Sequence, residues 1–168
     1  VIGGIDEAFR YIKDYPYSCW EQQLTKAVMA LHFKQLKGYL PKDMSWSEAE
    51  SVIKTTLKNA EMFQAPNGGM AFYIAHDEYT SPYLSAYTAL GFNWLRSGGY
   101  EIPAKVEENL HKYLLEFLRK DVYPSFYSRG LASSVRAVAL AALAEDKKIT
   151  ISDIQRYQNS VPDMDLFA

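Results

Sequence analysis

Apolar residues at helical spacing recur in segments along the whole chain, and proline, glycine or a capping hydroxyl bounds each segment. The segments start near residues 19, 47, 81, 103, 130 and 152, about every twenty to thirty-odd residues, which is typical of stacked helical hairpins. The predicted helices cover residues 4–14, 19–36, 47–63, 81–96, 103–118, 130–143 and 152–158, followed by the first turn of another over 164–168. An all-α protein is therefore predicted, and this rhythm does not distinguish an open solenoid from a closed ring of helix pairs.

Polar residues mark the predicted starts of several of these helices. Ser18 is the expected N-cap of the helix over 19–36, and Ser152 that of the short helix near the C-terminus. Ser47 and Glu50 have the spacing of a capping box. The short apolar run 70–75 follows a turn cluster and is expected to be a loop edge or a brief strand.

Size and charge restrict the class of protein. A chain of 168 residues, 48% of them hydrophobic, can bury one core, so one domain is the default expectation. The net charge of -2 and the pI near 5.9 give no basic footprint for nucleic acid. No apolar run approaches the length of a membrane span.

The only cysteine, Cys19, lies at the start of a predicted helix, three residues before Gln22. Residues three apart share one face of a helical turn, so the two side chains can meet. The free N–H groups and the positive dipole end at a helix start favour a nucleophilic thiolate. If the side chains react, ammonia leaves and an internal thioester closes. Taken alone this spacing is a weak signal, because a lone cysteine is more commonly a small buried hydrophobe.

The residues around this pair strengthen the interpretation. Residues 15–22 read Tyr-Pro-Tyr-Ser-Cys-Trp-Glu-Gln and closely resemble the Pro-Tyr-Gly-Cys-x-Glu-Gln thioester signature of the alpha-2-macroglobulin and complement family, most of all its bacterial branch. Two further segments resemble Gln-x-x-Asp-Gly-Gly-Phe and Trp-Leu-Thr-Ala-Tyr of the same domains: residues 64–72, Gln-Ala-Pro-Asn-Gly-Gly-Met-Ala-Phe, and residues 80–87, Thr-Ser-Pro-Tyr-Leu-Ser-Ala-Tyr. Residues 134–143 are similar to the later alanine- and leucine-rich helix. Ser18 stands where the family has glycine, and it would be strained if that position needs a positive φ.

The resemblance implies an α/α toroid, a fold of roughly a dozen helices in paired layers. Residues 1–168 would be a single all-helical fragment of that thioester domain, partial or truncated, within a larger multidomain chain. The start at Val1 without an initiator Met fits this expectation. The resemblance also implies a periplasmic or cell-surface, extracellular protein, often part of a lipoprotein.

The function implied is covalent protease trapping, which is not enzymatic turnover. In the family, cleavage by a protease exposes the thioester, and a nucleophile of the attacker takes the acyl group from the position of Gln22. Complement-type members use a histidine for this transfer, and the matching loop, 120–134, contains none. We therefore expect direct attack by amines, chiefly lysine side chains of the target protease.

A thioester hydrolyses in water unless it is covered, so the resemblance also implies an apolar wall. Tyr15, Tyr17 and Trp20 are the candidates for this wall, and ordinary core packing is the alternative role for each. Glu21 matches the family's acid between cysteine and glutamine. A first-turn carboxylate that the helix dipole favours is the equal alternative for Glu21.

Two other interpretations stay open at this point. An enzyme can be built on the same α/α ring, since Gln64-x-x-x-Gly68-Gly69-x-x-Phe72 is similar to repeats of terpene cyclases, and protein prenyltransferases use related helix pairs. Such enzymes need aspartate clusters or zinc ligands, and the chain offers only Asp-Met-Asp at 163–165 and one cysteine. The other interpretation is a scaffold member of the family in which the thioester never forms and Cys19 stays free.

The three histidines do not predict a metal site. His32 and His111 lie on predicted helices, where structural or solvated histidines are the more common kind. The run His-Asp-Glu at 76–78 is expected to be a surface loop, because adjacent side chains point in different directions. No metal, cofactor or catalytic residue is predicted.

Overall fold

The computed structural model describes residues 4–16, 18–75, 79–120 and 122–165. The elements are α1 (Ile5–Asp14), α2 (Trp20–Leu36), η1 (Lys37–Tyr39), α3 (Ala49–Asn59), η2 (Ala60–Phe63), α4 (Pro82–Ser97), α5 (Ala104–Lys120), α6 (Arg129–Glu145), α7 (Ile151–Gln155) and η3 (Gln158–Asp163). Over these residues the β pairing is limited to one antiparallel bridge between Gln64 and Met70. The prediction of an all-α fold is confirmed. None of the described helices is both long enough and apolar enough to cross a bilayer.

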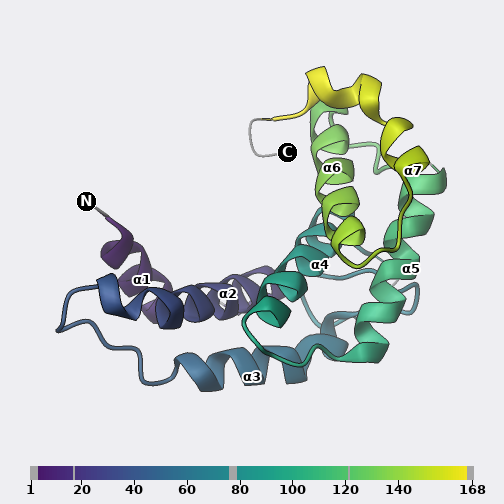
Figure 1. Cartoon of the computed structure of the whole chain (residues 1–168). Helices are drawn as coiled ribbons and strands as arrows, with labels where there is room; N and C mark the ends of the chain where they lie inside the picture. The colour runs from purple at the N-terminus through teal and green to yellow at the C-terminus, as the bar shows by residue number, and fades with distance from the viewer. Residues whose placement is uncertain (1–3, 17, 76–78, 121, 166–168) are drawn as a thin grey trace.

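Helix α4 lies at the centre of the arrangement. It packs against α2, α5 and α6, while α1 and α3 pack on α2 and η3 packs on α6. Figure 1 shows an open arc, with α1 to α3 on one limb and α5 to α7 on the other. Over the described residues the arc does not close into a ring, and it is consistent with part of a helical toroid.

The helix starts that depend on local chemistry alone agree with the predictions. Ser81 is the N-cap of α4 and accepts the backbone N–H of Leu84 at 3.2 Å, with Pro82 as the first helical residue. Helix α5 begins directly after Pro103. Proline suits these positions because its missing N–H is one that a helix start leaves unpaired anyway.

Two predicted caps, apart from that of α2, are wrong. Ser47 and Glu50 form no capping box, because the N-cap of α3 is Glu48 and it makes no side-chain cap bond. The Glu50 carboxylate instead accepts hydrogen bonds from Lys34 of α2 and from Tyr100, which lies between α4 and α5, as described below. Ser152 lies inside α7, and the cap is Thr150, whose N–H donates to Asp153 Oδ2 at 2.8 Å.

The predicted helical turn over 164–168 is also wrong for its first residues. The 3₁₀ helix η3 ends at Asp163, and Met164 is extended, with φ -74° and ψ 154°. Residues 166–168 lie outside the described part of the chain, as do 76–78.

The core is continuous through the helices and is made of aliphatic and aromatic side chains. Its largest fully buried apolar members are Trp20, Phe9, Phe92, Leu24, Ile53, Met70, Leu84, Leu95, Leu110, Leu114 and Leu143. On α2, the helically spaced Leu24, Val28 and Leu31 are buried, and Leu36 is partly buried against the core.

The glycine turn at residues 64–69 is locked against α5. Gly68 has a φ of +90°, and a Cβ there would lie 2.4 Å from the backbone oxygen of Asn109. Only glycine allows both this φ and this approach without strain. Gln64 fastens the turn through its Nε2, which donates to the backbone oxygens of Gly68 at 2.9 Å and Val106 at 2.8 Å.

Candidate functional site

Cys19 and Gln22 meet in the first turn of α2. Cys19 is the N-cap residue, with φ -64° and ψ 164°, and Gln22 is the third helical residue. The two residues form a capping box: Gln22 Oε1 accepts the backbone N–H of Cys19 at 3.1 Å, and the Cys19 side chain faces the backbone N–H of Gln22. Cys19 is half-buried and is a free thiol. The thiol and the carboxamide therefore share one turn on one side of the helix.

Ser18 directly precedes Cys19, the N-cap of α2. The φ of Ser18 is defined with an atom of residue 17, which lies outside the described residues, so the strain expected at this position stays a prediction. The predicted N-cap thus shifts by one residue, from Ser18 to Cys19. The Ser18 carbonyl accepts the side-chain N–H of Gln23 at 2.7 Å, which ties the chain before the helix to its first turn.

Trp20 anchors the turn to the core. Its side chain is fully buried, and its ring stacks on Phe63 at a centroid distance of 5.3 Å. The indole N–H donates to Thr88 Oγ1 of α4 at 2.8 Å, and the backbone N–H donates to the Phe72 carbonyl at 2.8 Å. The Phe72 carbonyl therefore gives the Trp20 N–H, which has no partner within the helix, a hydrogen-bond acceptor. Of the two roles considered for Trp20, its full burial supports core packing.

Glu21 points to α4 and accepts the phenol of Tyr83 on Oε1 at 2.9 Å. One turn further along both helices, the hydroxyls of Thr25 and Tyr87 are hydrogen-bonded at 2.8 Å. Tyr83 was not among the predicted site residues, although it lies in the segment 80–87 that carries part of the resemblance. Phe72 and Thr88 were also missed, because a carbonyl and a buried hydroxyl leave no pattern in a sequence.

Tyr15 and Tyr17 are the two tyrosines proposed for a protective wall. Tyr15 follows the last residue of α1 as its C-cap, is half-buried, and its ring lies 5.3 Å from that of Tyr11. Tyr17 lies outside the described residues.

The capping geometry has a chemical consequence for Gln22. A backbone N–H that donates to the carboxamide oxygen draws electron density from the carbonyl carbon, Cδ. If a nucleophile adds to Cδ, the same N–H of Cys19, 3.1 Å from Oε1, stabilises the negative charge that develops on the oxygen. The turn therefore holds a thiol, an electrophilic carbon and an oxyanion donor within four residues.

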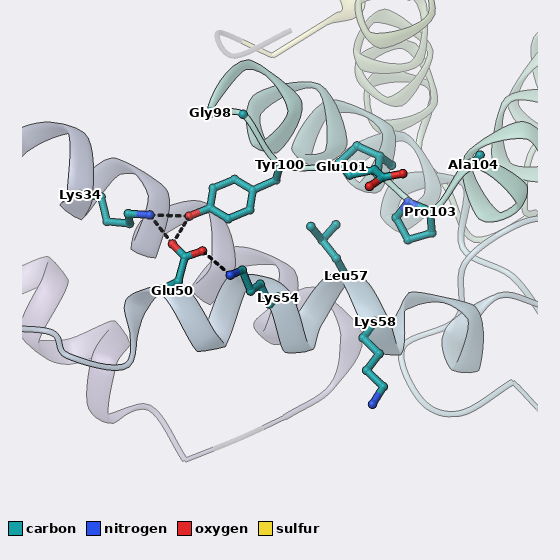
Figure 2. Close-up of a pocket in the computed structure, with 12 residues that line it drawn as sticks. Lys34, Glu50, Lys54, Leu57, Lys58, Gly98, Tyr100, Glu101, Pro103 and Ala104 are labelled. Atoms are coloured by element: carbon teal, nitrogen blue, oxygen red, sulfur yellow. Dashed lines mark hydrogen bonds and ion pairs between the residues drawn. The ribbon is translucent and has the colours of Figure 1, made fainter.

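A pocket of about 710 Å³ lies away from this turn, between α2, α3 and the segment that joins α4 to α5. Figure 2 shows Lys34, Lys54 and Tyr100 directed at Glu50. The Glu50 carboxylate accepts from Lys34, from Tyr100 at 2.7 Å and from Lys54 at 3.0 Å. These bonds lower the pKa of Glu50 to about 2, and the bond from Lys34 has the largest effect. The polar groups satisfy one another, so this cluster joins helices and does not mark a second reaction site.

One set of side chains in the described residues has the composition of a metal site. Ligand atoms of Glu107, His111 and Asp146 all lie within 4.8 Å of one another. However, the Arg96 guanidinium pairs with both carboxylates, with Asp146 at 2.9 Å. His111 Nε2 completes the cluster, 3.1 Å from Asp146. Because Arg96 already supplies positive charge, the arrangement suits a clamp between α4, α5 and α6 better than a cation site.

The cluster predicts a pH dependence of stability. Burial lowers the pKa of His111, and the attraction of Asp146 and Glu107 opposes this only in part, while Lys148 and Arg96 add to the lowering. The unfolded chain, with a histidine pKa of about 6.5, then binds the proton more readily than the folded protein does. The contribution of His111 to the free energy of unfolding is fully present above about pH 6.5, and it is lost as the pH falls below that value.

We therefore expect the free energy of unfolding of the 168-residue chain to fall less steeply between about pH 7 and pH 5 in His111→Asn than in the wild type. Urea titrations at several pH values measure the slope. His32 lies on α2 beside Gln35, and His32→Asn is the matched control that should keep the wild-type slope. An unchanged or steeper slope in His111→Asn would contradict the assignment.

Of the two aspartates considered for an enzyme on this fold, Asp163 has its carboxylate in an ion pair and Asp165 is held through its backbone. Asp163 pairs with Arg129 at 2.9 Å, and the backbone N–H of Asp165 donates to Ser134 Oγ at 3.0 Å. The Gln64 side chain, part of the motif shared with terpene cyclases, fastens a turn, as described above. These residues act in the packing of the fold.

The features so far define a class of domain: an all-α arc of helical hairpins with a Cys-x-x-Gln turn at a helix start. No family model matches the chain, and no curated protein matches it. Solved structures of bacterial alpha-2-macroglobulins do match its fold. The native conformation of the Escherichia coli protein is similar over 96% of this chain, with a TM-score of 0.82 and 20% identity.

Two further structures extend this match. Salmonella alpha-2-macroglobulin reacted with methylamine is similar over 96% of the chain, with a TM-score of 0.82 and 19% identity. Trypsin-activated Escherichia coli alpha-2-macroglobulin is similar over 89%, with a TM-score of 0.77 and 20% identity. The chain spans 10%, 11% and 11% of the lengths of these three chains. It therefore has the fold of about a tenth of a bacterial alpha-2-macroglobulin, and the resemblance found in the sequence is confirmed at the level of the fold.

Proposed function

We propose that this chain is the thioester-containing domain of a bacterial alpha-2-macroglobulin-like protease inhibitor, and that Cys19 and Gln22 form the thioester. The observation that carries the proposal is the shared first turn of α2, where Gln22 Oε1 accepts the Cys19 N–H. The fold, common to three alpha-2-macroglobulin structures, supports it.

Closure of the thioester balances without a further reactant. The Cys19 thiolate attacks Gln22 Cδ, and the Sγ–Cδ bond forms. The resulting oxyanion is held by the Cys19 N–H. As the carbonyl re-forms, the Cδ–Nε2 bond breaks, and the amide nitrogen takes up the one proton that the thiol released and leaves as ammonia. The product is an acyl group activated toward nucleophiles.

Amines of a bound protease are the proposed nucleophiles. A lysine amine adds to Cδ, the Sγ–Cδ bond breaks, and the product is an amide between the protease and residue 22, with a free Cys19 thiol. The descriptions of the matched structures fit this chemistry, since one protein was reacted with methylamine and another was activated by trypsin. The domain is consumed in one event, so it acts as a covalent trap and not as an enzyme.

The proposed setting is a larger multidomain protein in the periplasm or at the cell surface, as part of a lipoprotein. Residues 1–168 are then a single all-helical fragment of the thioester domain of that protein, in keeping with the tenth of the matched chain that they span. Neighbouring domains of the parent chain would cover the first turn of α2 until a protease attacks.

The test is the intact mass of the full-length protein that contains this chain, before and after methylamine treatment. A closed thioester makes the protein lighter than its encoded mass by one ammonia, and treatment then adds one methylamine at residue 22. Tandem mass spectrometry of the peptide around Cys19 and Gln22 locates both changes. The encoded mass, with no uptake of methylamine, would contradict the proposal and favour a scaffold with a free cysteine.

A further inference from the structure

Two hydrogen bonds from tyrosines of α4 to α2 have similar lengths but reach different turns of α2. The Tyr83 phenol donates to Glu21 at 2.9 Å, and the Tyr87 hydroxyl bonds to that of Thr25 at 2.8 Å. The two tyrosine rings stack, with centroids 6.4 Å apart and planes at 8°. The first bond reaches the turn that contains Cys19, whereas the second reaches the next turn of α2.

The first turn of α2 is held from outside the helix, on one side by the buried Trp20 ring and its bond to Thr88. Its N–H groups have no partner four residues earlier in the helix, so its orientation depends on contacts from outside. Glu21 lies between Cys19 and Gln22 in this turn, and its side chain is bonded to another helix. The Tyr83 backbone N–H is itself held by the Tyr127 hydroxyl at 3.2 Å. The hydrogen bond between the Glu21 carboxylate and the Tyr83 phenol thus ties the first turn of α2 to α4.

The Tyr83 phenol is a dependable donor. Burial, followed by the hydrogen bond to Glu21 and its negative charge, raises the pKa of Tyr83. The phenol therefore keeps its proton at neutral pH, and the bond to the Glu21 carboxylate is charge-assisted, a class about twice as strong as neutral hydrogen bonds.

We propose that Tyr83 is a positioning residue for thioester closure, acting through Glu21 on the turn that holds Cys19 and Gln22. This inference rests on the proposed function. Ring closure needs Sγ and Cδ to approach along one direction, and small misplacements of reacting groups cost large factors in rate. Glu21 belongs to the backbone segment that joins Cys19 to Gln22, so the Tyr83–Glu21 bond restricts the changes within this segment that would separate the two atoms.

The test compares Tyr83→Phe with Tyr87→Phe in the full-length protein. Each variant removes one hydroxyl and keeps its ring. We expect Tyr83→Phe to lower the fraction of closed thioester, measured by intact mass, about tenfold. Tyr87→Phe should keep the wild-type fraction. Equal fractions in the two variants would overturn the inference. A wild-type protein without any closed thioester would instead overturn the proposed function, so the two failures are distinguishable.

A second pair of variants excludes a loss of folding as the cause. Glu21→Gln keeps an oxygen that can accept the Tyr83 phenol, whereas Glu21→Ala removes it. We expect Glu21→Ala to lower closure as Tyr83→Phe does, and Glu21→Gln to restore most of it. Equal losses in Glu21→Gln and Glu21→Ala would show that the hydrogen bond is not what matters and would also overturn the inference.

Discussion

Replacing Cys19 with alanine is expected to abolish methylamine incorporation into the full-length protein and to return its mass to the encoded value. Cys19 is the only cysteine of the chain, so within the domain no other thiol can replace its sulfur. Gln22 would keep its carboxamide, but an amide without an adjacent thiolate does not react with amines under mild conditions. Intact mass with and without methylamine gives an all-or-none result.

Gln22→Glu provides the second half of this prediction. A carboxylate is a poor electrophile, so this variant should also fail to close and should keep a free thiol that reacts with a maleimide. The neighbouring Gln23 is the matched control, since its side chain bonds to the Ser18 carbonyl and not to the cap. Gln23→Glu should still take up methylamine. Uptake that persists in Cys19→Ala would show that the acyl group is elsewhere.

Replacing Trp20 with alanine is expected to lower the free energy of unfolding by about 3–5 kcal/mol, the usual cost of truncating a buried aromatic residue. Trp20 is fully buried and stacks on Phe63, so alanine leaves a cavity between α2 and η2. It also leaves Thr88 Oγ1 without the indole N–H that it accepts at 2.8 Å. Urea unfolding of the 168-residue chain, followed by circular dichroism, measures the loss.

Trp94 is the matched control for this truncation, because it is a tryptophan on α4 with 36% of its surface exposed. Trp94→Ala should lower the free energy of unfolding by much less than Trp20→Ala, since the site can fill with water. Equal losses in the two variants would show that Trp20 is not the anchor of the helix start.

Much of the fold could be predicted because helix starts are encoded locally. Ser81 and Pro82 cap and open α4 as predicted, since both act on atoms within the same turn. Glu50 shows the limit of such rules. Its spacing from Ser47 suits a capping box, but charged groups of Lys34 and Lys54 and the phenol of Tyr100 take the carboxylate instead. Tertiary contacts of this kind cannot be deduced from spacing.

The same division applies to the candidate site. The Cys19 and Gln22 pair is separated by one helical turn, so its geometry follows from the helix itself. The residues that hold the turn in place are remote in sequence: Thr88 is 68 positions from Trp20, and Tyr83 is 62 positions from Glu21. Only the packing of α2 on α4 brings them together, and no periodicity in the sequence indicates it.

Helix α4 owes its central place to small side chains. Ser85, Ala86, Ala89 and Gly91 are all buried there, and a Cβ on Gly91 would already come within 3.1 Å of Leu24. Neighbouring helices can approach α4 closely because these positions carry so few atoms. Added bulk at one of them would wedge α2 or α6 outward, at a typical cost of about 1–3 kcal/mol for an overfilled interior. The middle of the molecule is therefore more vulnerable to gaining a methyl group than its rim is to losing one.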